Sequence, residues 1–421
     1  MLESDSFINL IISETGKRFR YGIRKLANRK AISRESRLFS EAGRYFNDGN
    51  LDAAVEYYSQ VKLDPYYSQM AEKMLGWIAF LNGRLEKGWP FYPVTSIDRV
   101  PMIEFLTGYL KFFASGSVRV HKAARPWELR CLLKLTPWEQ NCQPRRGMLV
   151  WFNFGSSIGG EILCGKLLGK FSELHSGMRI TCAVDPRLLE IFRGTYPAIN
   201  FISKRDSLSP KRMKFDYYLL GRDLLGLIVN KEADFQALKK QRMTPYGSPI
   251  PWKGPQDAFK VAISWKTTNA EQGKYRNIPL ELLVSVLRKF PFAYCSAQHG
   301  ITDEEKSCLA GELGGRIDFD FFRPSGSLND FCLRLQQMDL VLSIDNSTMH
   351  MAGCIGVKTL GLLSIPSYWA YPLSGEDSRW YDSVCLIRQS VPGDWQATIE
   401  ELDNKLEAIY KTCAFYTSTT S

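Results

Sequence analysis

The chain has few histidines, and none of them is spaced to share a metal ion with another. Its 421 residues include only His121, His175, His299 and His350. Protein-held zinc sites usually combine His and Cys ligands at short spacings. The ten cysteines form no CxxC pair, and several lie inside apolar strand or helix patterns. We therefore expect no metal site, and thiols that stay reduced in a reducing compartment.

Long apolar runs are also missing. No stretch approaches the roughly 20 apolar residues that a transmembrane helix needs. The apolar stretch at residues 7–12 is brief, and its basic flank lies on the C-terminal side. A secretory signal has the opposite order. These absences predict a cytoplasmic protein.

Acidic residues are scarce at residues 17–37, which belong to a basic N-terminal segment at residues 1–37. Between Lys17 and Arg37 there are nine Lys or Arg and one acid, Glu35, so this stretch supplies eight of the ten net positive charges. The remainder is close to neutral, and we expect no specific nucleic-acid partner. Residues 17–37 also carry interleaved aromatics. They form either a peripheral contact with the anionic inner membrane face or a solvated basic helix packed on the next domain.

Hydrophobic and aromatic residues are plentiful. The hydrophobic share is 45%, and the aromatic side chains alone argue against a disordered chain. A chain of this length and composition buries large cores and divides into two or three domains.

Residues 38–110 contain a helical repeat. Residues 46–52 are echoed by residues 80–86, which aligns Gly83 with Gly49, and Tyr92 follows Tyr58 at the same offset. The offset matches the period of about 34 residues of tetratricopeptide repeats, in which a glycine turns the chain between two helices. Two units are fewer than a stable solenoid needs, so we expect the region to lean on the following domain. A generic helical hairpin bundle is the alternative.

Beyond a connector at residues 111–146, strands alternate with helices. Such alternation predicts parallel, doubly wound sheets of the Rossmann type. One series occupies residues 147–246 and a second occupies residues 257–412, with a linker rich in Pro and Gly between them. Two such domains make an α/β protein with a ligand cleft between its halves.

The most informative stretch is a strand–turn–helix in the second series. An apolar strand at residues 339–344 ends in Asp345, and the polar residues Asn346, Ser347 and Thr348 open a helix that continues through Met349. Helix N-termini present unpaired N–H groups and suit a diphosphate. Two further strand ends on the same edge carry Lys266 and Gln298, and Lys266 would bring positive charge to the phosphates.

Two side chains of this stretch have competing interpretations. His350 either bonds a phosphate or the sugar, or packs as an ordinary helix histidine under the strand. Asp345 is costly to bury at the end of a strand unless it contacts a ligand or caps the helix, and we favour ligand contact.

Residues 339–363 resemble the donor-site motif of the GT-B glycosyltransferases of family 9, the heptosyltransferase type. The run from Asp345 to Ala352 stands where that family has Asp, small polar residues, His, Leu and Ala. The resemblance covers about residues 148–402, and proteins that fuse tetratricopeptide repeats to such a domain are especially similar. It implies a GT-B-like pair of Rossmann-type domains. A nucleotide-diphosphate sugar would bind the C-terminal domain as donor, without a cofactor, in a metal-independent, inverting transfer.

The same resemblance raises a question about the catalytic base. The family carries Gly-Asp in its first N-terminal loop, and the Asp is the usual candidate base. This sequence has Gly159-Gly160-Glu161, so Gly160 stands at the Asp position. Glycine has no proton-accepting side chain. Either Glu161 takes the role, or the base comes from elsewhere, or activity is lost.

Three hypotheses follow. The first is a glycosyltransferase acting on a protein acceptor, as the repeats favour, or on a lipid-linked glycan, as the basic segment favours. The second is a catalytically silent scaffold of the same fold that holds a protein partner through its repeats. The third is a surface-binding protein working through residues 17–37.

Overall fold

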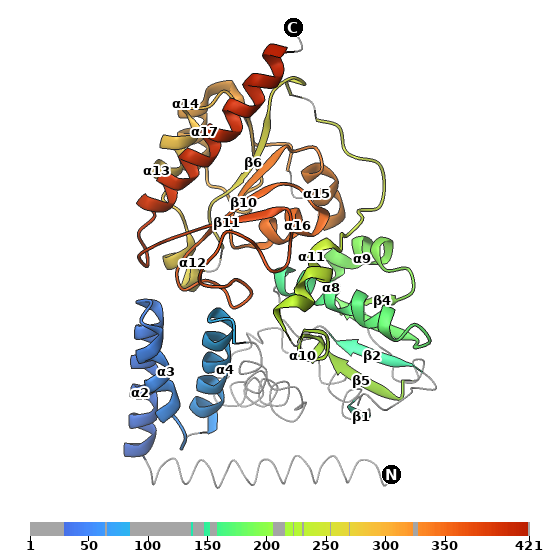
Figure 1. The fold of residues 1–421 in the computed structure, drawn as a ribbon, viewed down its shortest axis with the longest axis vertical. Helices are drawn as coiled ribbons and strands as arrows, with labels where there is room; N and C mark the ends of the chain where they lie inside the picture. Colours follow the sequence, from blue (N-terminus) through green and yellow to red (C-terminus); the bar gives the residue numbers. More distant parts are fainter. Residues whose placement is uncertain are drawn as a thin grey trace, which may run out of the picture.

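The protein consists of a helical region followed by two parallel α/β domains (Figure 1). Its structure, a computed structural model, describes residues 29–63, 65–84, 136–137, 147–151, 158–204, 215–221, 223–229, 231–252, 254–268, 270–322 and 327–419. None of the helices in these ranges is long and apolar enough to cross a bilayer.

The helical region repeats one turn at the predicted period. It contains α2 (Arg29–Asn47), α3 (Leu51–Gln60) and α4 (Pro65–Leu81). Gly49 and Gly83 follow the ends of α2 and α4 with positive φ angles of 77° and 72°, which glycine adopts without steric cost. The backbone hydrogen bond from Gly49 N to Phe46 O recurs at the same offset, from Gly83 N to Phe80 O.

This turn supports an internal repeat, but the tetratricopeptide assignment stays a prediction. Tyr92 and residues 85–110 lie outside the described part of the chain, as does most of the basic segment. Glu35, the single acid of residues 17–37, is buried and accepts a hydrogen bond from Leu63 N at 3.0 Å. It therefore ties α2 to the end of α3.

The first α/β domain is built on a five-stranded parallel sheet of order β1-β5-β2-β3-β4. Its strands are β1 (Thr136–Pro137), β2 (Met148–Trp151), β3 (Ile180–Val184), β4 (Asn200–Ser203) and β5 (Tyr217–Leu220). Its helices are α8 (Ile158–Leu174), η2 (Pro186–Leu188), α9 (Leu189–Thr195), α10 (Asp223–Ile228), η3 (Glu232–Asp234) and α11 (Phe235–Lys240). The strand β1 falls in the segment expected as a connector, and it extends this sheet beside β5.

The second α/β domain has a six-stranded parallel sheet of order β11-β10-β9-β6-β7-β8. Its strands are β6 (Lys260–Ser264), β7 (Ala293–Ser296), β8 (Ile317–Asp318), β9 (Leu340–Ile344), β10 (Thr359–Leu363) and β11 (Val384–Arg388). Its helices are α12 (Ala270–Arg276), α13 (Leu280–Leu287), α14 (Asp303–Leu313), η4 (Gly314–Arg316), α15 (Leu328–Leu335), α16 (Ser347–Ile355) and α17 (Gln396–Thr419). The two parallel sheets confirm the predicted α/β fold class.

The order of the second sheet creates a switch point between β6 and β9. From β6 the chain moves outward through β7 and β8, then returns to β9 and moves the other way through β10 and β11. In open parallel sheets, ligands bind at the carboxyl ends of the strands where the order reverses. The strand–turn–helix singled out in the sequence, β9 followed by α16, lies at this position.

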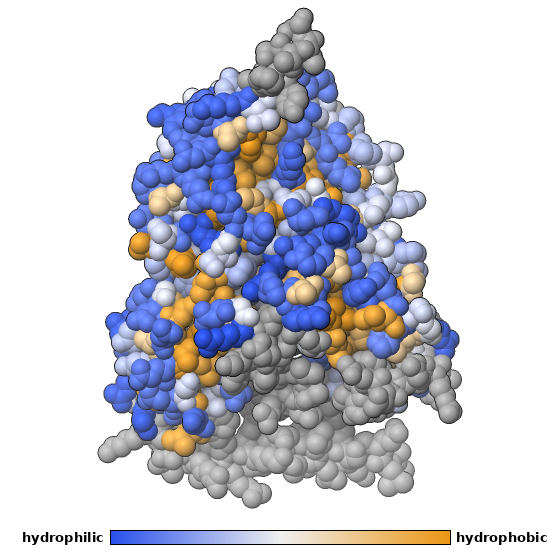
Figure 2. Space-filling view, viewed as in Figure 1, coloured by the Kyte–Doolittle hydropathy of each residue, from blue (hydrophilic) through white to orange (hydrophobic). Residues whose placement is uncertain are grey.

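The helical region docks on the loop between β10 and β11, residues 364–383. Trp77 Nε1 donates to Ser367 O at 3.2 Å, and the Trp77 ring meets Tyr368 edge-on at 5.5 Å. Leu373 N also donates to Leu81 O at 3.2 Å. Hydrophobic surface is visible near this junction, whereas much of the C-terminal domain is hydrophilic on the same face (Figure 2). The helical region therefore leans on the second α/β domain.

Arg379 joins three parts of the molecule. Its guanidinium donates to Glu232 of η3 at 2.8 Å and to Phe80 O of α4 at 3.2 Å. We expect Arg379→Met to lower the free energy of unfolding by about 1–3 kcal/mol, because it removes two charge-assisted hydrogen bonds that join separate elements. Urea denaturation measures this, and limited proteolysis should show earlier cleavage in α2–α4. In Arg44→Met, which breaks an exposed pair with Glu41, the change should stay below about 0.5 kcal/mol. Equal effects of both variants would contradict the docking role.

Candidate functional site

The site is organised by Asn346 at the switch point. Asn346 Nδ2 donates to Ser264 Oγ at the end of β6 at 2.8 Å. Its Oδ1 accepts from Thr348 N at 2.9 Å, which caps α16, and from Ser343 Oγ at 3.0 Å. One side chain thus fixes the turn after β9 and ties it to β6.

The three residues that follow Asn346 have different surroundings. Ser347 is exposed at the first position of α16, whereas Thr348 is buried. Met349 is fully buried and packs against Gly361 of β10, where an added Cβ would lie 2.5 Å from its sulfur. The Met349 side chain therefore belongs to the core. Of the three, Ser347 alone has an exposed side chain at the helix N-terminus.

Gln298, which was predicted to contact the nucleotide-sugar substrate, connects neighbouring strands. Its Oε1 accepts from the backbone N–H groups of Trp265 and Lys266, both at 2.9 Å. Its Nε2 donates to His299 O at 2.7 Å and to Lys266 O at 3.1 Å. The side chain thus shapes the end of β6 and holds it beside β7.

Lys266 is present at the carboxyl edge but is paired within the domain. Its Nζ lies 2.5 Å from Glu305 Oε2 at the start of α14. Glu305 also accepts from Thr302 N in a capping box. To reach a phosphate, Lys266 would have to exchange this partner.

Arg276 is the cation nearest to the α16 turn among the contacts of the described residues. Its NH1 lies 3.4 Å from Asp345 O and 3.7 Å from Asp345 Oδ2. The guanidinium also lies 5.9 Å from the centre of the Tyr368 ring. Sequence reasoning missed Arg276, because nothing in its spacing shows that α12 folds back over the end of β9.

Asp345 and His350 lie in a buried polar cluster with two tyrosines. His350 Nε2 is 3.6 Å from Asp345 Oδ1, and its Nδ1 is 2.9 Å from the Tyr381 hydroxyl. The Tyr371 hydroxyl lies 3.4 Å from Nε2. Burial alone would raise the pKa of Asp345, but Arg276 and His350 offset it, so this pKa lies below its usual value. Asp345 is therefore a buried carboxylate directly before the N-cap of α16.

The first α/β domain brings a second helix N-terminus to the same place. A Cβ added to Gly159 of α8 would overlap the His350 ring, so only glycine fits there. Further along, Nζ of Lys166 of α8 lies 4.6 Å from the centre of the Tyr381 ring, which packs on Gly353 of α16. The contacts advance in the same direction along both helices, so their N-termini lie at the same end. Two aligned dipoles favour an anion there.

Glu161, the predicted catalytic base, is engaged inside the first α/β domain. Its side chain is fully buried, and Oε1 lies 2.5 Å from Lys204 Nζ. The other oxygen accepts from Asp185 N at 2.7 Å. Burial raises the pKa of Glu161, and Lys204 opposes this shift. Both oxygens are thus occupied at the ends of β3 and β4, and the catalytic role remains a prediction.

Metal ligands do not gather in the part of the chain that the structure describes. There, no group of three or more His, Cys, Asp or Glu side chains is arranged to hold a metal ion.

Comparisons with known proteins give remote likenesses. No protein-family model matches the sequence. Protein FlbA of Caulobacter vibrioides is 25% identical over 283 residues, 61% of this chain and 46% of that protein. The chain thus spans about half the length of this curated relative.

Solved structures that resemble the chain are glycosyltransferases. Heptosyltransferase II of E. coli, described as an ADP-heptose enzyme, is 13% identical, with 63% of this chain and 99% of that chain covered and a TM-score of 0.42. A family 9 glycosyl transferase of Veillonella parvula is 12% identical, with coverages of 62% and 91% and a TM-score of 0.41. At these identities and TM-scores, the likeness supports no conclusion beyond the α/β fold that the two parallel sheets already show.

Proposed function

We propose that this protein is a glycosyltransferase whose C-terminal domain holds a nucleotide-diphosphate sugar at the N-terminus of α16. The observation that carries the proposal is the position of this helix at the switch point, with Asn346 shaping its first turn. Arg276 adds positive charge beside the turn. The N-terminus of α8 lies at the same end as the N-terminus of α16, because contacts between the two helices advance in the same direction. These features suit a diphosphate, which is the leaving group of sugar transfer from such donors.

In this proposal the protein itself stabilises the leaving diphosphate. The N–H groups of the first turn of α16 face the developing charge, and Arg276 neutralises part of it. The acceptor would approach from the first α/β domain, opposite the donor. The helical region favours a protein acceptor, whereas the basic segment at residues 17–37 favours a lipid-linked glycan at the inner membrane face.

The decisive experiment places a charge on Ser347. Ser347→Asp puts a carboxylate at the first position of α16, where it favours the helix itself. The same carboxylate repels a bound diphosphate by about 2–3 kcal/mol, so affinity should fall roughly 30- to 150-fold. Calorimetric titration with ADP, UDP and GDP measures this. Ser347→Asn carries a neutral side chain of nearly the same size as aspartate, so its nucleotide affinity should stay within about threefold of wild type. The proposal fails if wild type binds none of these nucleotides, or if both variants bind alike.

A catalytically silent scaffold is the second candidate. Gly160 supports it, because the glycine stands where the resembling family has its candidate base. The closed ion pair of Glu161 with Lys204 supports it further. Mass-spectrometric screening of sugar nucleotides for hydrolysis or transfer separates the two candidates. Turnover by the wild-type protein would eliminate the scaffold.

A further inference from the structure

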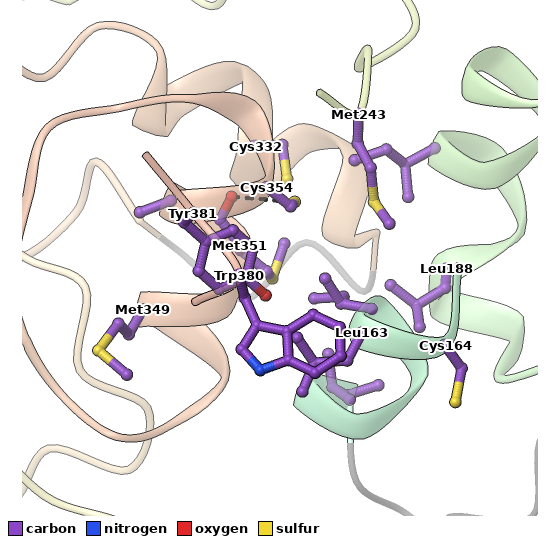
Figure 3. Close-up of a cluster of buried hydrophobic side chains, with 14 of the residues drawn as sticks. Leu163, Cys164, Leu188, Met243, Cys332, Met349, Met351, Cys354, Trp380 and Tyr381 are labelled. Atoms are coloured by element: carbon purple, nitrogen blue, oxygen red, sulfur yellow. Dashed lines mark hydrogen bonds between the residues drawn. The ribbon is translucent and has the colours of Figure 1, made fainter. Parts of the chain in front are cut away.

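Lys166 is a buried cation at the contact between the two α/β domains. It projects from α8, is fully buried, and its Nζ donates to Trp380 O in the β10–β11 loop at 2.6 Å. The same Nζ lies 4.6 Å from the centre of the Tyr381 ring. Figure 3 shows the apolar side chains that meet here from both domains, including Leu163 and Met351. An ammonium group is costly in such surroundings, so packing alone does not account for a lysine.

Tyr381 connects this lysine to α16. Its ring packs so closely on the helix that a Cβ added to Gly353 would lie 2.6 Å from Tyr381 Cγ. Its hydroxyl lies 2.9 Å from His350 Nδ1. Lys166 therefore holds one face of the ring while the hydroxyl orients His350.

The contacts continue from His350 to the start of the helix. His350 Nε2 lies 3.6 Å from Asp345 Oδ1, and Asp345 directly precedes the cap residue Asn346. A continuous series of contacts thus joins α8 of one domain to the helix N-terminus of the other.

We propose that Lys166 is a positioning residue for the donor site: by holding Trp380 and Tyr381 against α16, it fixes His350 and Asp345 at the diphosphate turn. The proposal rests on the proposed function for its ligand. It predicts that stability and donor binding respond in opposite directions when the lysine is replaced by an apolar side chain of similar length. Replacing a residue with a purely structural role would change stability and donor binding in the same direction, or change stability alone.

The first experiment compares Lys166→Met with wild type in ADP, UDP and GDP titrations. Methionine removes a desolvated ammonium and fits a buried apolar site. This gain exceeds the loss of the hydrogen bond to Trp380 O, so the variant should fold and resist denaturation better than wild type. The nucleotide that binds wild type should nevertheless bind the variant about 5- to 10-fold more weakly, a typical coupling between linked sites. Lys170→Met is the matched control. Lys170 lies one turn further along α8 and pairs with Glu173 at the surface, so this variant should bind like wild type. Unchanged affinity in Lys166→Met, or an equal loss in Lys170→Met, overturns the proposal.

Amide hydrogen exchange tests the same proposal without a nucleotide. In Lys166→Met, exchange should quicken in residues 345–350 and 364–383 although the variant as a whole is more stable. Unchanged exchange in these segments overturns the positioning role, whatever the binding data show. If exchange quickens but wild type binds no nucleoside diphosphate, the proposed function fails and the positioning of this turn by Lys166 stands.

Discussion

Replacing Asp345 with alanine is expected to lower the free energy of unfolding by about 3 kcal/mol at pH 7, because the substitution breaks a buried ion pair by removing one member. It removes a buried carboxylate and leaves Arg276 and His350 without their anionic neighbour. The remaining charge stays desolvated, which is the source of the cost. Urea denaturation measures the loss. Nucleotide affinity should also fall, because the turn before α16 loses the contacts of Asp345 with Arg276 and His350.

The dependence of this effect on pH follows from the lowered pKa of Asp345. A carboxyl group whose pKa lies below its ordinary value of 3.8 stabilises the folded protein fully above that value. The stabilisation disappears as the pH falls through the lower, folded pKa. The difference between wild type and Asp345→Ala should thus be constant from about pH 5 to 8 and shrink below about pH 4. Asp345→Asn keeps the shape of the side chain, so its free energy of unfolding should lie between those of wild type and Asp345→Ala. A difference that persists unchanged at pH 3 would show that the charge is unimportant.

Lys166→Met should show the second large effect, a stabilisation that grows as the pH falls. Burial, the largest influence, lowers the pKa of Lys166 from its ordinary value of 10.5 to about 7. Between these values the unfolded chain holds a proton that the folded protein lacks, so raising the pH stabilises the wild-type fold. From pH 7 to 9.5 this amounts to about 3 kcal/mol for wild type relative to the variant. Denaturation of both proteins at several pH values measures the difference.

Other ionisable groups act on Lys166 and are common to both proteins. Cys354 of α16 and Asp382 raise its pKa, and Arg242 lowers it. Because these groups remain in Lys166→Met, the difference between the two proteins isolates the lysine. Parallel curves for wild type and variant across pH 7–9.5 would show that Lys166 is not desolvated in the folded protein.

Much of the fold followed from local patterns in the sequence. The alternation of apolar strands with amphipathic helices predicted two parallel sheets, and the structure has them. The spacing of Gly49 and Gly83 predicted the recurring turn, because both positions require a positive φ angle that glycine supplies. The turn from Asp345 to Thr348 was found because a polar, capping sequence directly followed a fully buried strand.

The partners of the site residues did not follow from the sequence. Gln298 and Lys266 were expected to face a ligand. In the structure Gln298 binds the backbone directly after β6, and Lys266 pairs with Glu305. Glu161 was predicted as a candidate catalytic base, and the structure shows it paired with Lys204, which follows β4. In each case the partner lies on a different element, far along the chain. Sequence spacing reveals neighbours within a helix or strand but not such contacts.

By itself the sequence determined the element types, the two α/β series and the helix that opens after Asp345, because these depend on short-range periodicity and capping. Only the tertiary structure decided which helices meet. It placed Gly159 against His350 and Lys166 against Trp380, joining domains that are separate along the chain. The physical reason is that these contacts arise from strand order and close packing between the domains, where a glycine makes room for a ring and a carbonyl accepts a buried ammonium.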